Sequence, residues 1–280
     1  MKVIPSIPDA IHWSRNAPRP IALVPTMGAL HRGHTTLIDR ARELVGPAGS
    51  VAVSLFVNPT QFGPAEDFTR YPRPFETDRA LCELHQADLL FHPQAEAIYP
   101  PGFSTYVNEE EVSRTLCGAS RPGHYRGVCT VVSKLFNLLQ PDFALFGLKD
   151  FQQCKVITRM VRDLNMPVQI VPVETVREPD GLALSSRNQY LSPEERSQAP
   201  LLRCALLKAA EMIRAGQTDA AWLRALLREI LSGASLARID YIEIADATTL
   251  EPLNTVGPNS VIALAVFFGK TRLIDNLLLE

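Results

Sequence analysis

The 280-residue chain lacks the features that mark membrane and exported proteins. No apolar run reaches the ~18–20 residues that a membrane-spanning helix needs. The longest run, around residues 261–268, has the length of a core strand. The N-terminal sequence MKVIPSIPDAIHW is interrupted by two prolines and has no continuous apolar region, so no signal peptide is expected. These absences predict a soluble cytoplasmic protein without a membrane partner.

The chain also has no Cys-x-x-Cys pair and no excess of positive charge. Its five cysteines are scattered and odd in number, which favours reduced thiols over a disulfide framework or a zinc site. The formal net charge is −2, so a large surface for nucleic acid is not expected. No internal repeat or low-complexity tract is visible.

Apolar strand patterns alternate with helical patterns over the first two thirds of the chain. The expected strands are residues 21–24, 51–57, 88–91, 143–146 and 168–173. The expected helices are residues 33–44, 75–85, 128–139 and 151–164. This alternation predicts an α/β fold, a Rossmann-like parallel sheet with helices on both faces. Ligands of such sheets bind beyond the carboxyl ends of the strands, where the strand order reverses.

The pattern changes after about residue 176. Amphipathic helices are expected at residues 201–215 and 220–231, and antiparallel strands at 240–245, 261–268 and 271–278. We therefore expect two domains, a Rossmann-like domain at residues 1–176 and a smaller α+β domain at residues 177–280.

The stretch PTMGALHRGHTTLI directly follows the first expected strand. Gly28 and Gly33 allow a tight turn or a close approach to the backbone. The three-residue spacing of His31 and His34 places both imidazoles on one face of a helix's first turn. Unpaired N–H groups and the helix dipole favour an anion there. The stretch therefore predicts a phosphate site at which the imidazoles donate hydrogen bonds.

Two further stretches carry groups that suit phosphates. In DFALFGLKDFQQ, Lys149 lies at the carboxyl edge of the expected sheet, although a Lys149–Asp150 pair is also typical of solvated charges. In EPDGLALSSRNQYLS, two hydroxyls and one guanidinium are available from Ser185, Ser186 and Arg187. A turn of this composition is also ordinary loop chemistry.

Polar groups for a small substrate follow the second expected strand. Asn58 and Gln61 in NPTQF would bind a small polar molecule through directed hydrogen bonds. In RPGHYRG, Arg121, His124 and Arg126 form a cationic cluster, with a basic surface loop as the alternative for Arg126. The long Pro- and Gly-rich connection after residue 57 is typical of a functional or mobile loop.

Together these four stretches, in this order, resemble the pantothenate synthetase family, ligases that join pantoate to β-alanine with ATP. The resemblance runs from PTMGALHRGH to the terminal GKTRLIDN. The His-x-Gly-His element alone is shared with class I aminoacyl-tRNA synthetases and small adenylyltransferases, whereas NPTQF, RPGHYRGV, FGLKDFQQ and LALSSRN are more specific. The alternatives are a nucleotidyltransferase that stops at adenylyl transfer and a nucleotide-binding regulatory module without catalysis.

The resemblance implies a role for each matching residue. The catalytic residues would be His34, a proton donor, with His31, Lys149 and Arg187. ATP would contact Met27, Gly28, Ala29, Leu30, His31, Arg32, Gly33, His34, Gly147, Leu148, Lys149, Asp150, Val176, Leu184, Ser185, Ser186 and Arg187. Pantoate and β-alanine would contact Gln61, Gln153, Asn58 and Arg121. One departure is Leu148, where relatives often carry Glu or Gln, so this side chain is not expected to be essential.

The implied reaction has two steps. The pantoate carboxylate attacks the α-phosphate of Mg-ATP, and the amine of β-alanine then attacks the resulting pantoyl adenylate, which releases AMP and pantothenate. Positioning and charge stabilisation would dominate both steps. The resemblance also implies Mg²⁺, for which Asp78 or Asp150 are candidate ligands, a homodimer, and a smaller domain that closes over the active site. The loop after residue 57 would act as a lid that excludes water.

Overall fold

The structure is a computed structural model that describes residues 1–64 and 66–279. The chain divides into two compact units. Unit 1 contains Met1–Glu110, Arg121–Leu148 and Gln153–Glu174. Unit 2 contains Glu111–Ser120, Lys149–Gln152 and Thr175–Glu280. The expected division into residues 1–176 and 177–280 stays a prediction, because a division by contacts describes compactness and not independent folding.

Unit 1 is built on a six-stranded sheet in which every neighbouring pair of strands is parallel. The strands in chain order are β1 (Lys2–Ile4), β2 (Ile21–Thr26), β3 (Ser50–Leu55), β4 (Leu89–Phe91), β5 (Phe143–Gly147) and β6 (Gln169–Val173). Their order in the sheet is β1-β4-β3-β2-β5-β6. The predicted Rossmann-like α/β class is therefore confirmed.

The strand order reverses between β2 and β5. From β2 the chain continues to β3 on one side, whereas β5 pairs with the other side of β2 and leads on to β6. A crevice for a ligand is expected beyond the carboxyl ends of these two central strands. In unit 1, β2 ends at Thr26 and β5 ends at Gly147, so both of the first two motifs begin at this edge.

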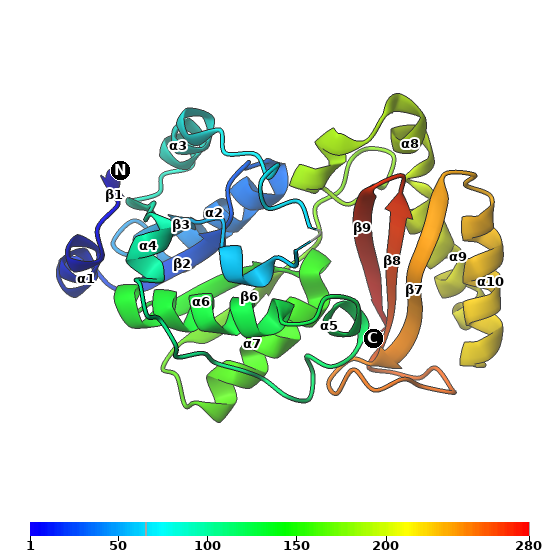
Figure 1. Cartoon of the computed structure of the whole chain (residues 1–280). Coiled ribbons are helices and arrows are strands. Elements are labelled where there is room, and N and C mark those ends of the chain that lie inside the picture. The colour runs from blue at the N-terminus through cyan, green and yellow to red at the C-terminus, as the bar shows by residue number, and fades with distance from the viewer. Residues whose placement is uncertain (65, 280) are drawn as a thin grey trace. The chain divides into compact units, whose positions relative to one another are not determined.

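Helices flank this sheet (Figure 1). They are α1 (Ile7–Asn16), α2 (Arg32–Val45), α3 (Phe75–Leu84), α4 (Ala95–Ile98), α6 (His124–Leu139) and α7 (Phe151–Asp163). Helix α2 buries Leu37, Ile38 and Ala41 in a core that includes Val24 of β2 and Val53 of β3. Within the described part of the chain, no helix combines the length and apolar character that crossing a membrane requires.

Strand β1 and helix α1 were not predicted from the sequence. The two prolines near the N-terminus were interpreted only as evidence against a signal peptide. In the structure the side chain of Ser6 caps α1 by accepting from the N–H of Asp9, and Pro8 lies in the first turn, where its missing N–H costs nothing.

Unit 2 contains a three-stranded antiparallel sheet in the order β7-β8-β9. Its strands are β7 (Ala237–Asp246), β8 (Ser260–Phe268) and β9 (Thr271–Leu279), and its helices are α5 (Leu116–Ser120), α8 (Pro193–Gln198), α9 (Leu201–Arg214) and α10 (Ala220–Ser232). Helices α9 and α10 cover the sheet (Figure 1), and Leu206, Leu227 and Leu264 belong to the shared apolar core. This unit is the smaller α+β part that the sequence predicts.

Candidate functional site

The loop between β2 and α2 carries the two predicted histidines. Gly28 has a φ of 91° and Ala29 a φ of 51°, so the chain makes a tight left-handed turn immediately after β2. His31 is the residue that caps α2, and His34 lies in the first turn of the helix. Their ring centroids are 4.1 Å apart. The predicted proximity of the two rings is confirmed, although only His34 belongs to the helix.

The two histidines cap the helix reciprocally. Nδ1 of His31 accepts from the N–H of Gly33 at 3.1 Å, and Nδ1 of His34 accepts from the N–H of His31 at 3.3 Å. A ring nitrogen that accepts a hydrogen bond cannot carry a hydrogen, so the hydrogen of each neutral imidazole lies on Nε2. This capping box therefore selects the tautomer in which Nε2 is the donor.

Asp78 of α3 holds the same loop from the side. Its Oδ2 accepts from the N–H of Ala29 at 2.8 Å, and its Oδ1 accepts from the N–H of Leu30 at 2.7 Å. The residue is 1% exposed. Burial raises the pKa of Asp78, and the two backbone donors offset part of the rise. In the structure, the carboxylate expected as a possible metal ligand thus fixes the backbone of the histidine loop.

Buried amides follow β3, as the sequence predicts. Nδ2 of Asn58 donates to Oε1 of Gln61 at 3.0 Å and to the carbonyl of Gly127 at 3.1 Å. Oδ1 of Asn58 accepts from the hydroxyl of Tyr99 at 2.9 Å. Nε2 of Gln61 lies 3.1 Å from Sδ of Met27, the first residue after β2. The loops after β2 and β3 therefore bring Met27 and Gln61 together within unit 1.

The cationic cluster lies at the start of α6, which begins at His124 and not at residue 128 as expected, and it is largely engaged within unit 1. Arg121 makes a two-pronged ion pair with Glu66, at 2.6 Å from Nε and 2.7 Å from a terminal nitrogen. It also contacts Nε2 of His124 at 2.9 Å, while Nδ1 of His124 lies 2.8 Å from the carbonyl of Gln61. Arg126 stacks on the ring of Tyr106 at 3.7 Å. The cluster thus fixes the loop that carries Gln61.

Arg121 also sets the ionisation of its partner. Burial raises the pKa of Glu66, but the hydrogen bonds and the charge of Arg121, together with Gly63 and His124, lower it by more, so the net pKa lies below the ordinary value. Glu66 is therefore an anion at neutral pH.

The motif after β5 continues into unit 2. Nζ of Lys149 lies 3.4 Å from both carboxylate oxygens of Asp150, whose side chain is 46% exposed. Gln152 is buried: its Oε1 accepts from the N–H of Cys117 at 2.9 Å, and its Nε2 donates to the carbonyl of Thr115 at 2.7 Å. Gln152 therefore anchors this segment, whereas Gln153, on the first turn of α7, belongs to unit 1.

The last motif of unit 2 is a short hairpin that leads into a 3₁₀ helix. The N–H of Leu184 donates to the carbonyl of Val176 at 3.0 Å and closes the hairpin. Ser185 caps the 3₁₀ helix Ser186–Tyr190, since its hydroxyl accepts from the N–H of Arg187 at 3.2 Å. Ser186 and Arg187 lie in the first turn of that helix, so the local fold presents them together.

Sequence reasoning assigned no role to Asp275 or Asn276. Both belong to the quoted GKTRLIDN stretch, and an acidic residue within an alternating apolar strand was the available signal. In the structure Asp275 is buried and pairs with Arg177, while Asn276 donates to the carbonyl of Lys149.

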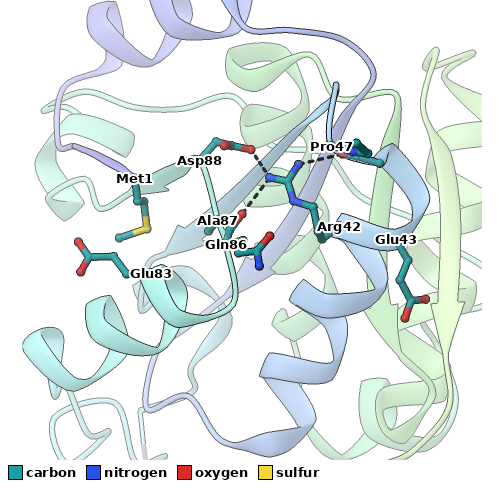
Figure 2. Close-up of a pocket in the computed structure, with 9 residues that line it drawn as sticks. Met1, Arg42, Glu43, Pro47, Glu83, Gln86, Ala87 and Asp88 are labelled. Atoms are coloured by element: carbon teal, nitrogen blue, oxygen red, sulfur yellow. Dashed lines mark hydrogen bonds and ion pairs between the residues drawn. The ribbon is translucent and has the colours of Figure 1, made fainter.

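A surface depression of about 760 Å³ lies elsewhere in unit 1, between the end of α2 and the start of β4 (Figure 2). Its Arg42 donates to the carbonyls of Gly46 and Gln86 and pairs with Asp88. These contacts tie together segments at the amino ends of β3 and β4. The depression is thus at the edge opposite to the one that binds ligands in parallel sheets.

Among the residues that the structure describes, protein side chains alone do not form a metal site. No group of three or more His, Cys, Asp or Glu side chains there is arranged to hold a metal ion. A Mg²⁺ ion that accompanies a nucleotide needs only one or two carboxylates, because phosphates and water complete its coordination.

Known proteins of one family are similar to this chain over its length. Residues 2–278 match the family model described as pantoate-beta-alanine ligase. A pantothenate synthetase of Thermotoga petrophila is 51% identical, with complete coverage of both chains.

Solved structures give the same result. The pantothenate synthetase of Thermus thermophilus superposes with a TM-score of 0.93 at 46% identity, covering 99% of each chain. A pantoate-beta-alanine ligase of Francisella tularensis, described as complexed with beta-gamma ATP and beta-alanine, has a TM-score of 0.81 at 35% identity, covering 99% of this chain and 97% of the other.

Proposed function

The chain belongs to the pantoate-beta-alanine ligase family and condenses pantoate with β-alanine at the expense of ATP, and we propose how its residues divide this work. The reaction forms pantothenate, AMP and pyrophosphate through pantoyl adenylate. The observation that best supports the assignment of residues is the histidine-capped start of α2 at the point where the strand order reverses. This is the place where a parallel sheet binds a nucleotide.

In the first step, an oxygen of the pantoate carboxylate attacks the α-phosphorus of ATP and pyrophosphate leaves. Residues 27–34 border ATP, and Nε2–H of His31 and of His34 donate to phosphate oxygens on which negative charge increases. His34 takes the proton-donating role that the family resemblance implies, as a hydrogen-bond donor whose hydrogen stays on Nε2. The capping bonds at Nδ1 hold both rings in the donor tautomer before ATP arrives, so no reorganisation is needed during the reaction.

The remaining contacts to ATP are assigned to the segment that follows β5 and to the hairpin that leads to Arg187. Lys149 neutralises charge on the phosphates. The phosphates are also covered by Ser185, Ser186 and Arg187. The backbone of Val176 contacts the adenine. Gly147, Leu148 and Leu184 complete this surface. The support is chemical, because a guanidinium, an ammonium and two hydroxyls form a suitable set for a polyphosphate.

Pantoate and β-alanine are held by uncharged amides. Gln61 and Gln153 bind pantoate, and Gln61 also lies close to β-alanine. Asn58 holds the Gln61 amide by donating to its Oε1. An amide donates to a carboxylate or hydroxyl and accepts from another hydroxyl, which matches a small hydroxy acid. The fourth expected contact, Arg121, is paired with Glu66, so we propose that it acts chiefly by fixing the Gln61 loop.

Mg²⁺ would enter with ATP. Of the two candidate ligands, Asp150 has a half-exposed carboxylate beside Lys149, whereas both oxygens of the buried Asp78 already accept N–H groups. Asp150 is therefore the better candidate. When bound, the ion would neutralise phosphate charge. We further propose a cytoplasmic homodimer, as the family resemblance implies.

The test is an assay of AMP and pyrophosphate release in which ATP, pantoate and β-alanine are omitted in turn. We expect steady AMP release only when all three are present. Without β-alanine, pyrophosphate formation should stop after about one turnover, because the adenylate stays bound. Sustained pyrophosphate release without β-alanine would instead identify an enzyme that stops at adenylyl transfer.

A further inference from the structure

Two adjacent residues of β9, Asp275 and Asn276, connect this strand to both ATP-binding segments proposed for unit 2. Successive side chains of a strand point to opposite faces of the sheet. Asp275 lies on the face that packs on the core and is 2% exposed, whereas Asn276 lies on the other face and is partly exposed. These two neighbouring residues of β9 therefore contact different segments of unit 2, the hairpin of Arg177 and the segment of Lys149.

Asp275 holds the hairpin that precedes the Ser185–Arg187 segment. Its two oxygens accept from both terminal nitrogens of Arg177, at 2.7 Å and 2.8 Å. The same guanidinium donates to the carbonyl of Gly181 at 3.0 Å. Arg177 pairs with Ala183 in an antiparallel bridge, next to the bond between Leu184 and Val176. The ion pair therefore fixes both arms of the hairpin.

Asn276 holds the segment of Lys149. Its Nδ2 donates to the carbonyl of Lys149 at 3.0 Å. Its own N–H donates to Oδ1 of Asp275 at 2.8 Å, so one carboxylate connects both anchors. Gln152 secures the far end of the same four-residue segment through the carbonyls of Val112 and Thr115. The backbone that carries the Lys149 ammonium is thus fixed from two sides.

From these contacts we infer that Asp275 and Asn276 are positioning residues for ATP, which keep Lys149 and the Ser185–Arg187 segment in one fixed arrangement within unit 2. Neither residue needs to touch the substrate. The inference rests on the proposed roles of Lys149 and Arg187 in ATP binding. It adds that the affinity for ATP depends on a strand that carries no ATP contact itself.

Asn276→Ala gives the clearest test, because it removes the neutral hydrogen bond to the carbonyl of Lys149 and leaves the buried ion pair in place. We expect the KM for ATP to rise about 3- to 10-fold, the effect of one lost hydrogen bond. The KM for pantoate should change less than twofold. The matched control is Gln198→Ala, since the Gln198 amide also connects two segments of unit 2, through Ser235 and Leu236, but away from the motifs.

Arg177→Lys tests the second anchor. Lysine keeps the charge but cannot make the two parallel bonds to Asp275, so the KM for ATP should again rise while the KM for pantoate changes less than twofold. The control is Arg196→Lys, which alters an ion pair with Asp180 on the surface of the same hairpin. That pair is solvent-exposed, so its alteration should leave the KM for ATP unchanged.

Lys149→Ala separates the inference from the function on which it rests. If Lys149→Ala raises the KM for ATP and both Asn276→Ala and Arg177→Lys leave it unchanged, β9 has no positioning role. If Lys149→Ala itself leaves ATP use unchanged, the proposed role of Lys149 fails and the inference fails with it. A rise in the KM values for ATP and pantoate alike, together with a lower melting temperature, would show a merely structural effect and also overturn the inference.

Discussion

His34 combines a structural and a chemical role in one side chain. Its Nδ1 caps the N–H of His31, and its Nε2 is the proposed donor to the phosphate. We expect His34→Ala to lower turnover by roughly 10²- to 10³-fold, the effect of one lost transition-state donor. Turnover is measured as AMP release at saturating substrates. His12→Ala, at an exposed position of α1, is the matched control. Near-normal turnover of a folded His34→Ala variant would remove His34 from the mechanism.

Gln61 is the proposed pantoate-binding residue, and its role would distinguish this ligase from an enzyme that only transfers adenylyl groups. Its Nε2 donates to the thioether of Met27, a weak acceptor that a substrate oxygen would replace favourably. We expect Gln61→Ala to weaken pantoate binding by roughly 10- to 100-fold, because about 1–3 kcal/mol is lost when polar groups stay unpaired.

The affinity for ATP should hardly change in this variant. Calorimetric titration with a non-hydrolysable ATP analogue and then with pantoate measures both affinities. Gln169→Ala, on an exposed position of β6, serves as the control. Loss of ATP affinity with intact pantoate affinity would place Gln61 in the nucleotide site instead.

At the scale of elements, the Glu66–Arg121 pair joins the loop after β3 to the segment before α6. Because the pKa of Glu66 is lower in the folded chain than its ordinary value of 4.5, the stabilisation is present above that value. It is lost as the pH falls through the folded-state pKa. We therefore expect Glu66→Gln to lower the free energy of unfolding by about 1–2 kcal/mol at pH 7.

The difference between Glu66→Gln and the parent chain should shrink as the pH falls below about 4.5, because the parent carboxylate then becomes protonated. Urea denaturation at pH 7 and at pH 3 measures it. Glu43→Gln provides the comparison, since the Glu43–Arg40 pair is solvent-exposed and should contribute little at either pH. A constant difference across this range would mean that the ion pair does not stabilise the fold.

The helices and strands differ in how well the sequence predicts them. Long periodic segments such as α2 and β8 were predicted within a few residues, because one buried face sets their pattern. Strand β1 was missed and the equally short β4 was not, because β4 is a wholly buried apolar run whereas β1 is largely exposed. Helix α1 was missed because its proline at the first turn resembles a break. The sequence therefore does not resolve a residue such as proline, which is compatible both with the first turn of a helix and with an interruption of regular structure.

The candidate site shows the same limit. Glycines and histidines at fixed spacing predicted the tight turn and the paired rings of the histidine loop, since those residues act through their own neighbours in the chain. Partners from distant segments were not predicted. Asp78, which holds the histidine loop, lies almost fifty positions after Ala29, and Asp275, which holds the hairpin of unit 2, lies 98 positions after Arg177. Such pairs become visible only when the fold brings them together.

For the whole molecule, the division into units has a consequence for folding. Residues 175–280 contain the apolar core of unit 2, but its segments 111–120 and 149–152 come from earlier in the chain. Cys117, from the first of these, lies 3.3 Å from the hydroxyl of Tyr241 and 3.5 Å from the guanidinium of Arg272. A fragment of residues 175–280 should therefore fold but unfold at a lower temperature than the intact chain.

Tyr241→Phe makes this expectation specific, because the substitution removes only the hydroxyl. In the intact chain the hydroxyl contacts Cys117, so its loss should cost about 0.5–1.5 kcal/mol, measured by chemical denaturation. In the fragment that partner is absent and the hydroxyl meets water, so the same substitution should be nearly neutral. Leu227→Ala, within the core retained by both, should destabilise both equally. An equal cost of Tyr241→Phe in fragment and intact chain would show that the early segments do not stabilise β7.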